Sequence, residues 1–318
     1  MIVLANDGIS EKGVQLLKEA DITVLEARVS PEHLSKFIND NNVDALLVRS
    51  ATQVRKDLID ECPNLKIIGR GGIGMDNIDV EYAIDKGIYI INTPKASCKS
   101  VAELVFAHFF SLARFLHESN RLMPLEGETN FNALKKSFNN ATELSGKTLG
   151  VIGMGNIGIE VIKMGISLGM KILAYNRTPK TEKIQLTFFD GQSLNFEIKS
   201  VNLDKVLRNA DFISLNTGFT GEYLIDSKEL GLMKEGVFIA NTARGGVINE
   251  VALLDAIESG KVYGAALDVF EKEPVPEVLI LMNPALSLSP HVGGNTIDAQ
   301  NRIGEELAQQ IIKIKAQL

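Results

Sequence analysis

A glycine-rich motif is the pattern in this chain whose chemistry is most specific. It spans residues 147–158, KTLGVIGMGNIG, and its GxGxxG glycines are Gly153, Gly155 and Gly158. The three glycines follow the apolar, strand-like run at 148–152 and precede a helical pattern. In this context the spacing is typical of dinucleotide binding. The glycines permit a tight turn, close approach of a pyrophosphate and close helix–strand packing. We predict a dinucleotide site here, with N–H groups of Asn156 and Ile157 facing the anion; the alternative is a glycine-rich turn without a ligand.

The end of the next strand-like run bears on which nicotinamide cofactor is bound. NAD enzymes usually have Asp or Glu there, which bonds the ribose 2′-hydroxyl. This chain instead has Asn176, followed by Arg177. A carboxylate would repel a 2′-phosphate and an arginine would attract it, so the local sequence favours NADP(H) or weak discrimination. In the alternative, Arg177 only stacks on the adenine or lies in solvent.

Three polar side chains in the C-terminal half have the chemistry of a hydride-transfer site. Hydride transfer to a carbonyl compound leaves negative charge on the carbonyl oxygen, and a histidine can supply the proton. His291 follows the strand-like run Leu286–Ser289, at the edge where doubly wound sheets place ligands. A carboxylate such as Glu273 would orient the ring, and an arginine such as Arg244 would fix the substrate carboxylate. Taken singly, each of the three could be an ordinary surface or core residue.

Composition restricts the classes of protein and site. The chain has 318 residues, of which 45% are hydrophobic and 23% charged, as in ordinary soluble proteins of about two domains. Its 33 basic and 40 acidic residues give a net charge of −7, which argues against nucleic acid as a partner. The two cysteines and four histidines form no CxxC or HExxH pattern, so we expect no metal site. No apolar run reaches the ~20 residues of a membrane span, and no signal-peptide pattern opens the chain, so we expect a cytoplasmic protein without a membrane partner.

Strand-like and helix-like stretches alternate along the chain. They predict an α/β fold of two Rossmann-like, doubly wound parallel-sheet domains with the active site in the interdomain cleft. We expect a substrate domain over residues 1–98 plus 293–318 and a dinucleotide-binding domain over residues 99–292. A long helix is expected at about Val101–Arg121, and its His108 and His117 are interpreted as packing or interface residues. Asp190-Gly191, inside the β-rich segment 184–198, is typical of a type I′ hairpin turn; the hairpin could cover a sheet edge or contact another subunit.

Motifs along almost the whole chain resemble those of the D-isomer-specific 2-hydroxyacid dehydrogenase family. Besides the glycine motif, they are NTARGG at 241–246, ALDVFEKEP at 266–274 and SPHVGG at 289–294. The segments LVRSAT at 47–52 and GRGGIGMDNID at 69–79 resemble the D-3-phosphoglycerate dehydrogenase branch of the family. The motifs occur in the family's order, so the resemblance extends over both expected domains.

The resemblance implies roles for individual residues. Arg244, Glu273 and His291 match the family's catalytic residues. In addition to the glycine motif with Asn156 and Ile157, the implied cofactor-binding residues are Asn176, Arg177, Thr217, Ala243, Asp268 and Gly294. The implied substrate-binding residues are Arg49, Ser50, Arg70, Ile73 and Gly74. In relatives the loop at 73–74 holds the substrate carboxylate through backbone N–H groups. Arginines at the positions of Arg49 and Arg70 face a phosphate in the phosphoglycerate branch.

The resemblance implies reversible oxidation of a D-2-hydroxyacid with NAD or NADP. The first candidate substrate is 3-phospho-D-glycerate, which would give 3-phosphohydroxypyruvate at the entry to serine biosynthesis. An NADPH-dependent hydroxypyruvate or glyoxylate reductase is the alternative, encouraged by Arg177, although a small unphosphorylated substrate would not need both Arg49 and Arg70. A nucleotide-sensing binding module on the same scaffold is a third interpretation, disfavoured because all three catalytic candidates are present.

Three further expectations concern departures from the family pattern and assembly. Asn216-Thr217-Gly218 replaces the usual His-x-Pro beside the cofactor, so cofactor affinity is expected to differ. The chain ends at Leu318, directly after the closing helix, so we expect no C-terminal regulatory domain and no serine feedback through one. In relatives the long helix and its following loop carry the dimer contact, so we expect a homodimer.

Overall fold

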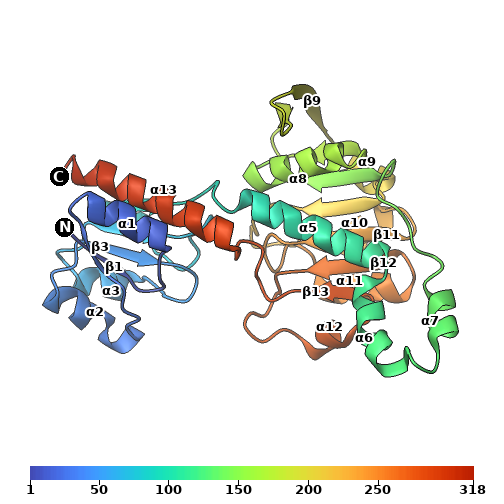
Figure 1. Cartoon of the computed structure of the whole chain (residues 1–318), viewed down its shortest axis with the longest axis horizontal. Helices are drawn as coiled ribbons and strands as arrows, with labels where there is room; N and C mark the ends of the chain where they lie inside the picture. The colour runs from blue at the N-terminus through green and yellow to red at the C-terminus, as the bar shows by residue number, and fades with distance from the viewer. The chain divides into compact units, whose positions relative to one another are not determined.

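The computed structural model describes residues 1–318, which divide into two compact units (Figure 1). Unit 1 consists of Met1–Ser100 and Gly294–Leu318, and unit 2 consists of Val101–Gly293. The expected boundaries lie within two residues of this division. Both units are α/β with parallel sheets, as predicted from the alternating pattern.

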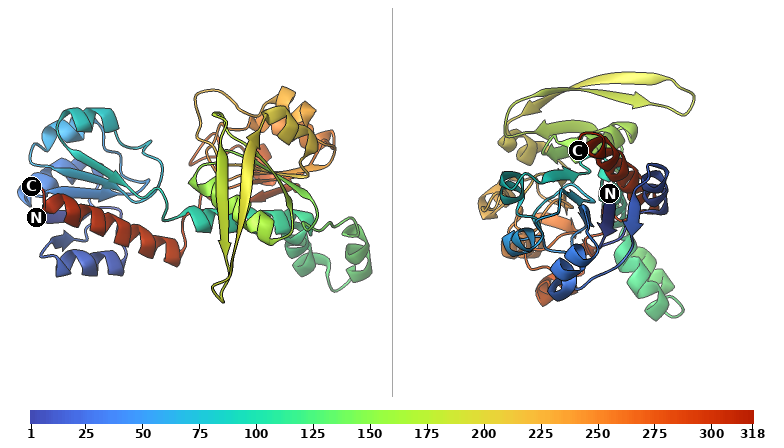
Figure 2. Two further views of the ribbon diagram at one scale, coloured as in Figure 1. Left: turned by 90° about the horizontal axis from the view of Figure 1, so that it is seen from above. Right: turned by 90° about the vertical axis from the view of Figure 1, so that its left-hand side faces the viewer.

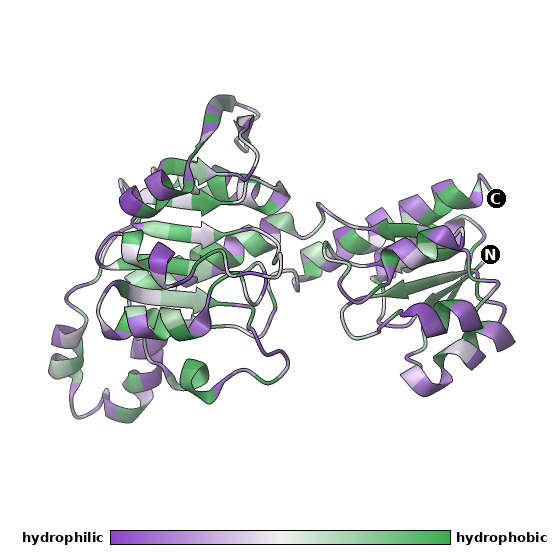
Figure 3. Cartoon of the chain, turned by 180° about the vertical axis from the view of Figure 1, so that it is seen from behind, coloured by the Kyte–Doolittle hydropathy of each residue, from purple (hydrophilic) through white to green (hydrophobic).

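Unit 1 is built on a five-stranded parallel sheet in the order β2-β1-β3-β4-β5. The strands are β1 (Ile2–Ala5), β2 (Thr23–Leu25), β3 (Ala45–Val48), β4 (Ile67–Arg70) and β5 (Tyr89–Asn92). One face packs against α1 (Glu11–Glu19) and α13 (Ile297–Lys315), and the other against α2 (Pro31–Asp40), α3 (Lys56–Glu61) and α4 (Val80–Asp85). Because both faces are covered, the strands are almost continuously apolar, as the hydropathy colours of Figure 3 show.

Unit 2 is built on an eight-stranded sheet in the order β13-β12-β11-β10-β6-β7-β9-β8. Its strands are β6 (Thr148–Ile152), β7 (Lys171–Tyr175), β8 (Thr181–Thr187), β9 (Ser193–Val201), β10 (Phe212–Leu215), β11 (Val237–Asn241), β12 (Val262–Leu267) and β13 (Leu286–Leu288). All pairs are parallel except β8–β9.

Helices cover both faces of the sheet in unit 2. On one face lie α5 (Cys98–Ala113) and α8 (Asn156–Ser167). On the other lie α9 (Leu203–Asn209), α10 (Ser227–Leu232) and α11 (Glu250–Glu258). The remaining helices are α6 (Leu116–Glu126), α7 (Phe131–Ser137) and α12 (Val278–Met282). No helix in the chain is both long enough and apolar enough to cross a membrane.

Two local expectations need correction. The helix expected at about 101–121 is interrupted, because Phe115 adopts a left-handed backbone (φ 53°) between α5 and α6. The antiparallel hairpin is present and extends as a two-stranded ribbon (Figure 2), but its turn is not type I′. Only Gly191, not Asp190, has a positive φ, and the Phe188 N–H donates to the Gln192 carbonyl around a three-residue loop.

Candidate active site

The glycine motif forms the turn between β6 and α8. At Gly153 (φ 101°) an added Cβ would lie 2.6 Å from the backbone oxygen of Asn216, and at Gly158 it would lie 1.9 Å from the oxygen of Gly153. The fold itself therefore requires these two glycines. An added Cβ at Gly155 would meet no atom within 4 Å. The backbone at the start of α8 is thus open on the side where a pyrophosphate would approach.

Two buried hydroxyls beside the glycine turn fit a dinucleotide. Thr217 Oγ1 and Thr242 Oγ1, just past β10 and β11, are buried without a hydrogen-bond partner in the protein. Buried polar atoms are almost always hydrogen-bonded, and ribose and phosphate oxygens would supply partners. The open backbone at Gly155 and these hydroxyls all lie at the carboxyl ends of adjacent strands, where doubly wound sheets bind ligands.

Asn176 and Arg177 directly follow the strand β7, beside the glycine turn. The Asn176 Oδ1 accepts a hydrogen bond from the Met154 N–H (3.2 Å), and its Nδ2 donates to the Thr178 carbonyl (2.8 Å). Asn176 therefore stabilises the glycine turn through its side chain. In NAD-binding domains an acidic residue usually occupies this position and contacts the ribose. Arg177 is exposed beside it.

The loop after β11 carries Arg244 and is tightly fixed. Asn241 accepts from the Ala243 N–H through Oδ1 (3.1 Å) and donates to the Arg244 carbonyl through Nδ2 (2.9 Å). The Arg244 Nη1 donates to the Ala243 carbonyl (2.8 Å). A Cβ at Gly245 would lie 1.9 Å from the Phe270 oxygen, so this loop touches the loop that follows β12. Arg244 and Glu273 thus come from neighbouring loops.

His291 and Glu273 form a hydrogen-bonded pair. The His291 Nδ1 lies 2.8 Å from the Glu273 Oε2, and the Glu273 Oε1 accepts from the Phe270 N–H (3.0 Å). Both side chains reach solvent, with 48% of His291 and 37% of Glu273 exposed. Because Glu273 holds Nδ1, the ring directs Nε2 toward any oxygen that binds in front of it. This is the arrangement of an oriented proton donor and acceptor.

Asp268, expected beside the cofactor, lies beneath the His291 loop and is 1% exposed. Its carboxylate accepts hydrogen bonds from the Ser289 hydroxyl (2.6 Å) and from the N–H groups of Val292 (2.8 Å) and Gly293 (2.9 Å). Both oxygens are therefore occupied by donors of the chain itself. The expected site residues His291, Glu273, Arg244 and Asp268 all come together in unit 2.

Glu250 belongs to the same region, although the sequence did not single it out. It is buried at the start of α11, and burial raises its pKa. The Glu250 N–H donates to Glu271 Oε1 (2.9 Å), and the Glu271 N–H donates to Glu250 Oε1 (2.8 Å). The Tyr223 hydroxyl donates to the other oxygen of Glu271 (3.2 Å). These reciprocal hydrogen bonds link α11 to the loop that carries Glu273. The sequence around Glu250 contains no motif from which they could have been predicted.

The expected substrate residues gather in unit 1, where β3 and β4 end. Arg49 lies over Gly71, with its Cγ 3.6 Å from where a Cβ would stand, and the Arg70 guanidinium occupies the position of a Cβ at Gly72. The Arg49 N–H donates to Asp7 (2.7 Å), and its Nη2 donates to Asn295 (3.2 Å). Two arginine side chains therefore lie over consecutive glycines.

The remaining expected residues also lie in unit 1. Ser50 is exposed directly after Arg49, and the Ile73 carbonyl, next to Gly74, accepts from the Asn92 side chain (2.9 Å). Gly294, expected at the cofactor, is the first residue of the second segment of unit 1, and its carbonyl accepts from Gln300 (3.1 Å).

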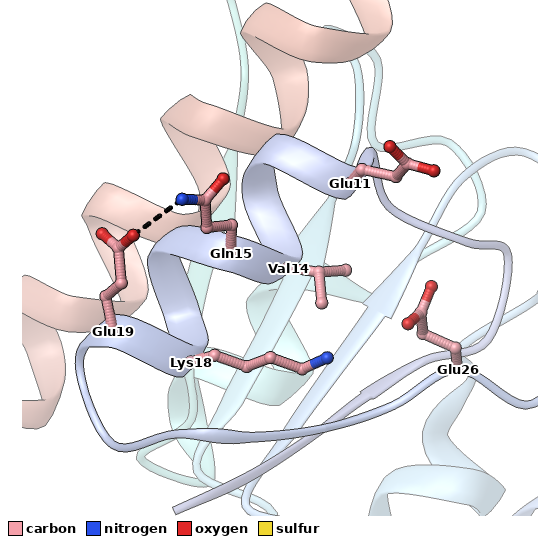
Figure 4. A pocket seen from close by; sticks show the side chains of 6 residues that line it. All are labelled: Glu11, Val14, Gln15, Lys18, Glu19 and Glu26. Carbon is pink, nitrogen blue, oxygen red and sulfur yellow. Dashed lines mark hydrogen bonds between the residues drawn. The ribbon is translucent and has the colours of Figure 1, made fainter.

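An open surface depression lies beside α1 in unit 1 (Figure 4). It is lined by Glu11, Val14, Gln15, Lys18, Glu19 and Glu26. Gln15 donates to Glu19 within it (2.8 Å). It contains no candidate site residue.

Comparisons with known proteins agree with this geometry. Residues 106–293 match the model of the D-isomer specific 2-hydroxyacid dehydrogenase NAD binding domain. A hydroxypyruvate reductase from Thermotoga maritima is 41% identical over 98% of this chain and 97% of that protein. A D-3-phosphoglycerate dehydrogenase from Methanocaldococcus jannaschii is 37% identical over 98% of this chain, but the chain spans only 57% of that protein. The structure of a glyoxylate reductase from Paecilomyes thermophila superposes with a TM-score of 0.79 and 30% identity, covering 98% of this chain and 93% of that one.

The matched segment 106–293 coincides with unit 2 from within α5 to its last residue. It contains the glycine turn, the unpartnered threonine hydroxyls and the His291–Glu273 pair, and the full-length similarity extends over unit 1. The predicted fold and the predicted family resemblance are confirmed. The chain belongs to the D-isomer specific 2-hydroxyacid dehydrogenase family and is a nicotinamide-dependent oxidoreductase.

Proposed function

We propose that the protein interconverts 3-phospho-D-glycerate and 3-phosphohydroxypyruvate, a step of serine biosynthesis. The observation that carries this choice of substrate is the pair of arginines, Arg49 and Arg70, over consecutive glycines in unit 1. Two guanidinium groups in an acidic protein suit a dianionic phosphate. Unit 1 is assigned to the substrate and unit 2 to the cofactor. Ser50 and the backbone N–H groups of residues 73–74 are assigned to the substrate as well.

The chemistry of the reaction is assigned to three residues of unit 2. His291 Nε2 gives a proton to the carbonyl oxygen during reduction and takes it from the hydroxyl during oxidation. Glu273 holds Nδ1 of the ring and so aims Nε2. Arg244 binds the substrate carboxylate and polarises the carbonyl. When bound, the nicotinamide supplies or accepts the hydride.

The cofactor is assigned to the glycine turn and the ends of the neighbouring strands. The N–H groups of Asn156 and Ile157 face the pyrophosphate, and the buried hydroxyls of Thr217 and Thr242 take ribose or phosphate oxygens. Ala243, beside Thr242, lines the same edge. With no carboxylate at the end of β7, both NADH and NADPH are accepted. An Arg177→Ala variant should lower kcat/KM for NADPH and leave that for NADH unchanged.

Hydroxypyruvate reduction is the second candidate function. It is favoured by the hydroxypyruvate reductase whose full length this chain matches at 41% identity. Hydroxypyruvate carries the same carboxylate and carbonyl, so the roles of Arg244 and His291 are unchanged. Only the assignment of the arginine pair to a phosphate differs between the two candidates.

Steady-state kinetics separate the candidates. We would measure kcat/KM for 3-phosphohydroxypyruvate, hydroxypyruvate and glyoxylate, each with NADH and NADPH. A preference of about 100-fold for the phosphorylated substrate, equal to ~2.7 kcal/mol, supports the first proposal, and Arg70→Gln should then remove most of it. Equal or better use of hydroxypyruvate selects the reductase. No turnover of any 2-oxoacid, together with tight cofactor binding, would refute both and favour a nucleotide-sensing role.

The proposal includes a homodimer formed through unit 2. Large apolar side chains are exposed on α6 and α7, among them Leu116 (61%), Leu125 (78%) and Phe131 (56%). Such a concentration of exposed apolar side chains on two adjacent helices is typical of a subunit interface. A twofold dimer would bury them on both subunits.

A further inference from the structure

His108 is a buried titratable residue that the proposed mechanism does not use. It lies in α5 and is 6% exposed. Its Nδ1 lies 2.8 Å from the Ser287 hydroxyl, and its Nε2 lies 3.0 Å from the Ser289 hydroxyl. The sequence pattern indicated only packing or an interface for it. Both ring nitrogens are instead committed to serines at the end of β13, next to the His291 loop.

The hydrogen bonds around Ser289 fix the direction of donation. The Ser289 hydroxyl lies 2.6 Å from the Asp268 Oδ1, and an ionised carboxylate only accepts. The single hydroxyl hydrogen of Ser289 therefore points to Asp268. It follows that His108 donates its Nε2–H to Ser289, and in the neutral ring its Nδ1 then accepts from the Ser287 hydroxyl.

This pattern requires a neutral ring, which has one donor and one acceptor nitrogen. The surroundings favour that state. Burial lowers the pKa of His108 below its ordinary value, the charge of Asp268 opposes the shift, and His117 adds slightly to it. The ring is therefore neutral at neutral pH, and its tautomer is set by the two serines.

Asp268 links the hydrogen bonds of His108 and Ser289 to the loop that carries His291. Its carboxylate also accepts from the N–H groups of Val292 and Gly293, the two peptide groups that directly follow His291. The His291 backbone is left-handed, with φ 55°, a conformation that residues other than glycine rarely adopt. Such conformations persist only where the surrounding structure determines them.

We propose that His108 and Ser289 are positioning residues for His291. They orient the Asp268 carboxylate, which holds the two following peptide groups and so the left-handed backbone that aims the imidazole at Glu273. The inference rests on the proposed function only in assigning proton transfer to His291. The positioning itself is a property of the folded chain and can be measured without turnover.

The test compares His108→Leu with His108→Gln in the full-length protein. Leucine fills a similar volume without hydrogen bonds, whereas glutamine can donate to Ser289. We expect kcat to fall about tenfold in the leucine variant, with little change in KM for the cofactor, and to be largely restored in the glutamine variant. His117→Leu is the matched control, because His117 interacts with Ser111, the Pro284 carbonyl and Glu118 and makes no hydrogen bond to Ser289 or Asp268, and it should leave kcat unchanged.

Amide hydrogen exchange by NMR gives the readout that does not depend on activity. The N–H groups of Val292 and Gly293 should exchange about tenfold faster in His108→Leu and in Ser289→Ala, but not in His108→Gln. Ser289→Ala removes one hydroxyl and serves if the leucine variant does not fold. Unchanged exchange at both amides overturns the proposal, as do equal kcat losses in the leucine and glutamine variants. If the wild-type protein reduces no 2-oxoacid, the proposed function fails and the exchange measurement alone decides the positioning.

Discussion

Glu273 is the residue whose removal tests the catalytic pair most directly. In Glu273→Gln the side chain keeps its size but loses the charge that faces His291 Nδ1 at 2.8 Å. We expect kcat for 2-oxoacid reduction to fall about 100-fold, because the ring loses the carboxylate that fixes its tautomer and stabilises its protonated form. The matched control is Glu277→Gln, an exposed glutamate that pairs only with Lys272. Similar kcat values for the two variants would show that Glu273 is not part of the proton-transfer site.

Alanine substitutions at two glycines of the same turn should affect different properties, cofactor affinity at Gly155 and stability at Gly158. Gly155→Ala adds a methyl group to open space, so the protein should fold normally but bind NADH at least about tenfold more weakly, because the methyl group occupies the pyrophosphate path. Gly158→Ala places a Cβ 1.9 Å from the Gly153 oxygen and should cost about 1–3 kcal/mol of stability. Cofactor titration by fluorescence and thermal unfolding separate the two effects. Normal cofactor affinity in Gly155→Ala would place the dinucleotide elsewhere.

At the residue scale, the catalytic candidates could be predicted from sequence motifs, whereas the side chains that contact them in the fold could not. The pair of His291 with Glu273 follows from the chemistry that a proton donor needs, and the structure brings the two residues together. The contacts of His108 and Glu250 could not be predicted, because each depends on a partner far along the chain: Ser289 lies 181 residues from His108, and Glu271 lies 21 residues from Glu250. Tertiary contacts of that kind leave no local pattern.

Elements were predicted where the local sequence determines them. The strands of both sheets are apolar runs bounded by polar turns, and β13 (Leu286–Leu288) begins where the run expected at Leu286–Ser289 begins and ends one residue earlier. The interruption at Phe115 was not predicted, because the residues around it are good helix formers. The left-handed turn there is stabilised by tertiary packing, in which the Phe115 ring contacts Phe138 and Tyr263 with centroids 5.5 and 5.9 Å away.

The stability of the folded protein should depend on pH through Glu250, the residue that links α11 to the Glu273 loop. Its pKa is raised by burial, so the folded state holds this proton more tightly than the unfolded chain does. The contribution of Glu250 to stability therefore falls as pH rises from the ordinary value of 4.5 through the raised value. Glu250→Gln keeps an oxygen to accept from the Glu271 N–H but has no charge to bury. We expect its Tm relative to wild type to rise between pH 4.5 and pH 8. A Tm difference that is constant over this range would contradict the assignment.

At the scale of the whole molecule, the proposed dimer can be tested by one charge. Leu125→Asp places a carboxylate in the apolar surface of α6, where 78% of the leucine is exposed in the single chain. We expect the mass by light scattering to fall from that of a dimer to that of a monomer, because burying an unpaired charge is costly. Leu318→Asp, an exposed leucine outside this surface, is the control. A wild-type protein that is monomeric at micromolar concentration would contradict the dimer.

Unit 1 is assembled from the two ends of the chain, with unit 2 inserted between them. Its core requires Ile303, Leu307 and Ile311 of α13, which pack on the same sheet face as Leu17 of α1. During synthesis residues 1–100 therefore emerge with one face of their sheet covered by α1 alone, and unit 2 is completed before α13 leaves the ribosome. The first unit to be translated is the last to be finished. A ribosome that stalls before residue 297 would release a finished cofactor unit tethered to a sheet with an exposed apolar face, the kind of surface that chaperones bind.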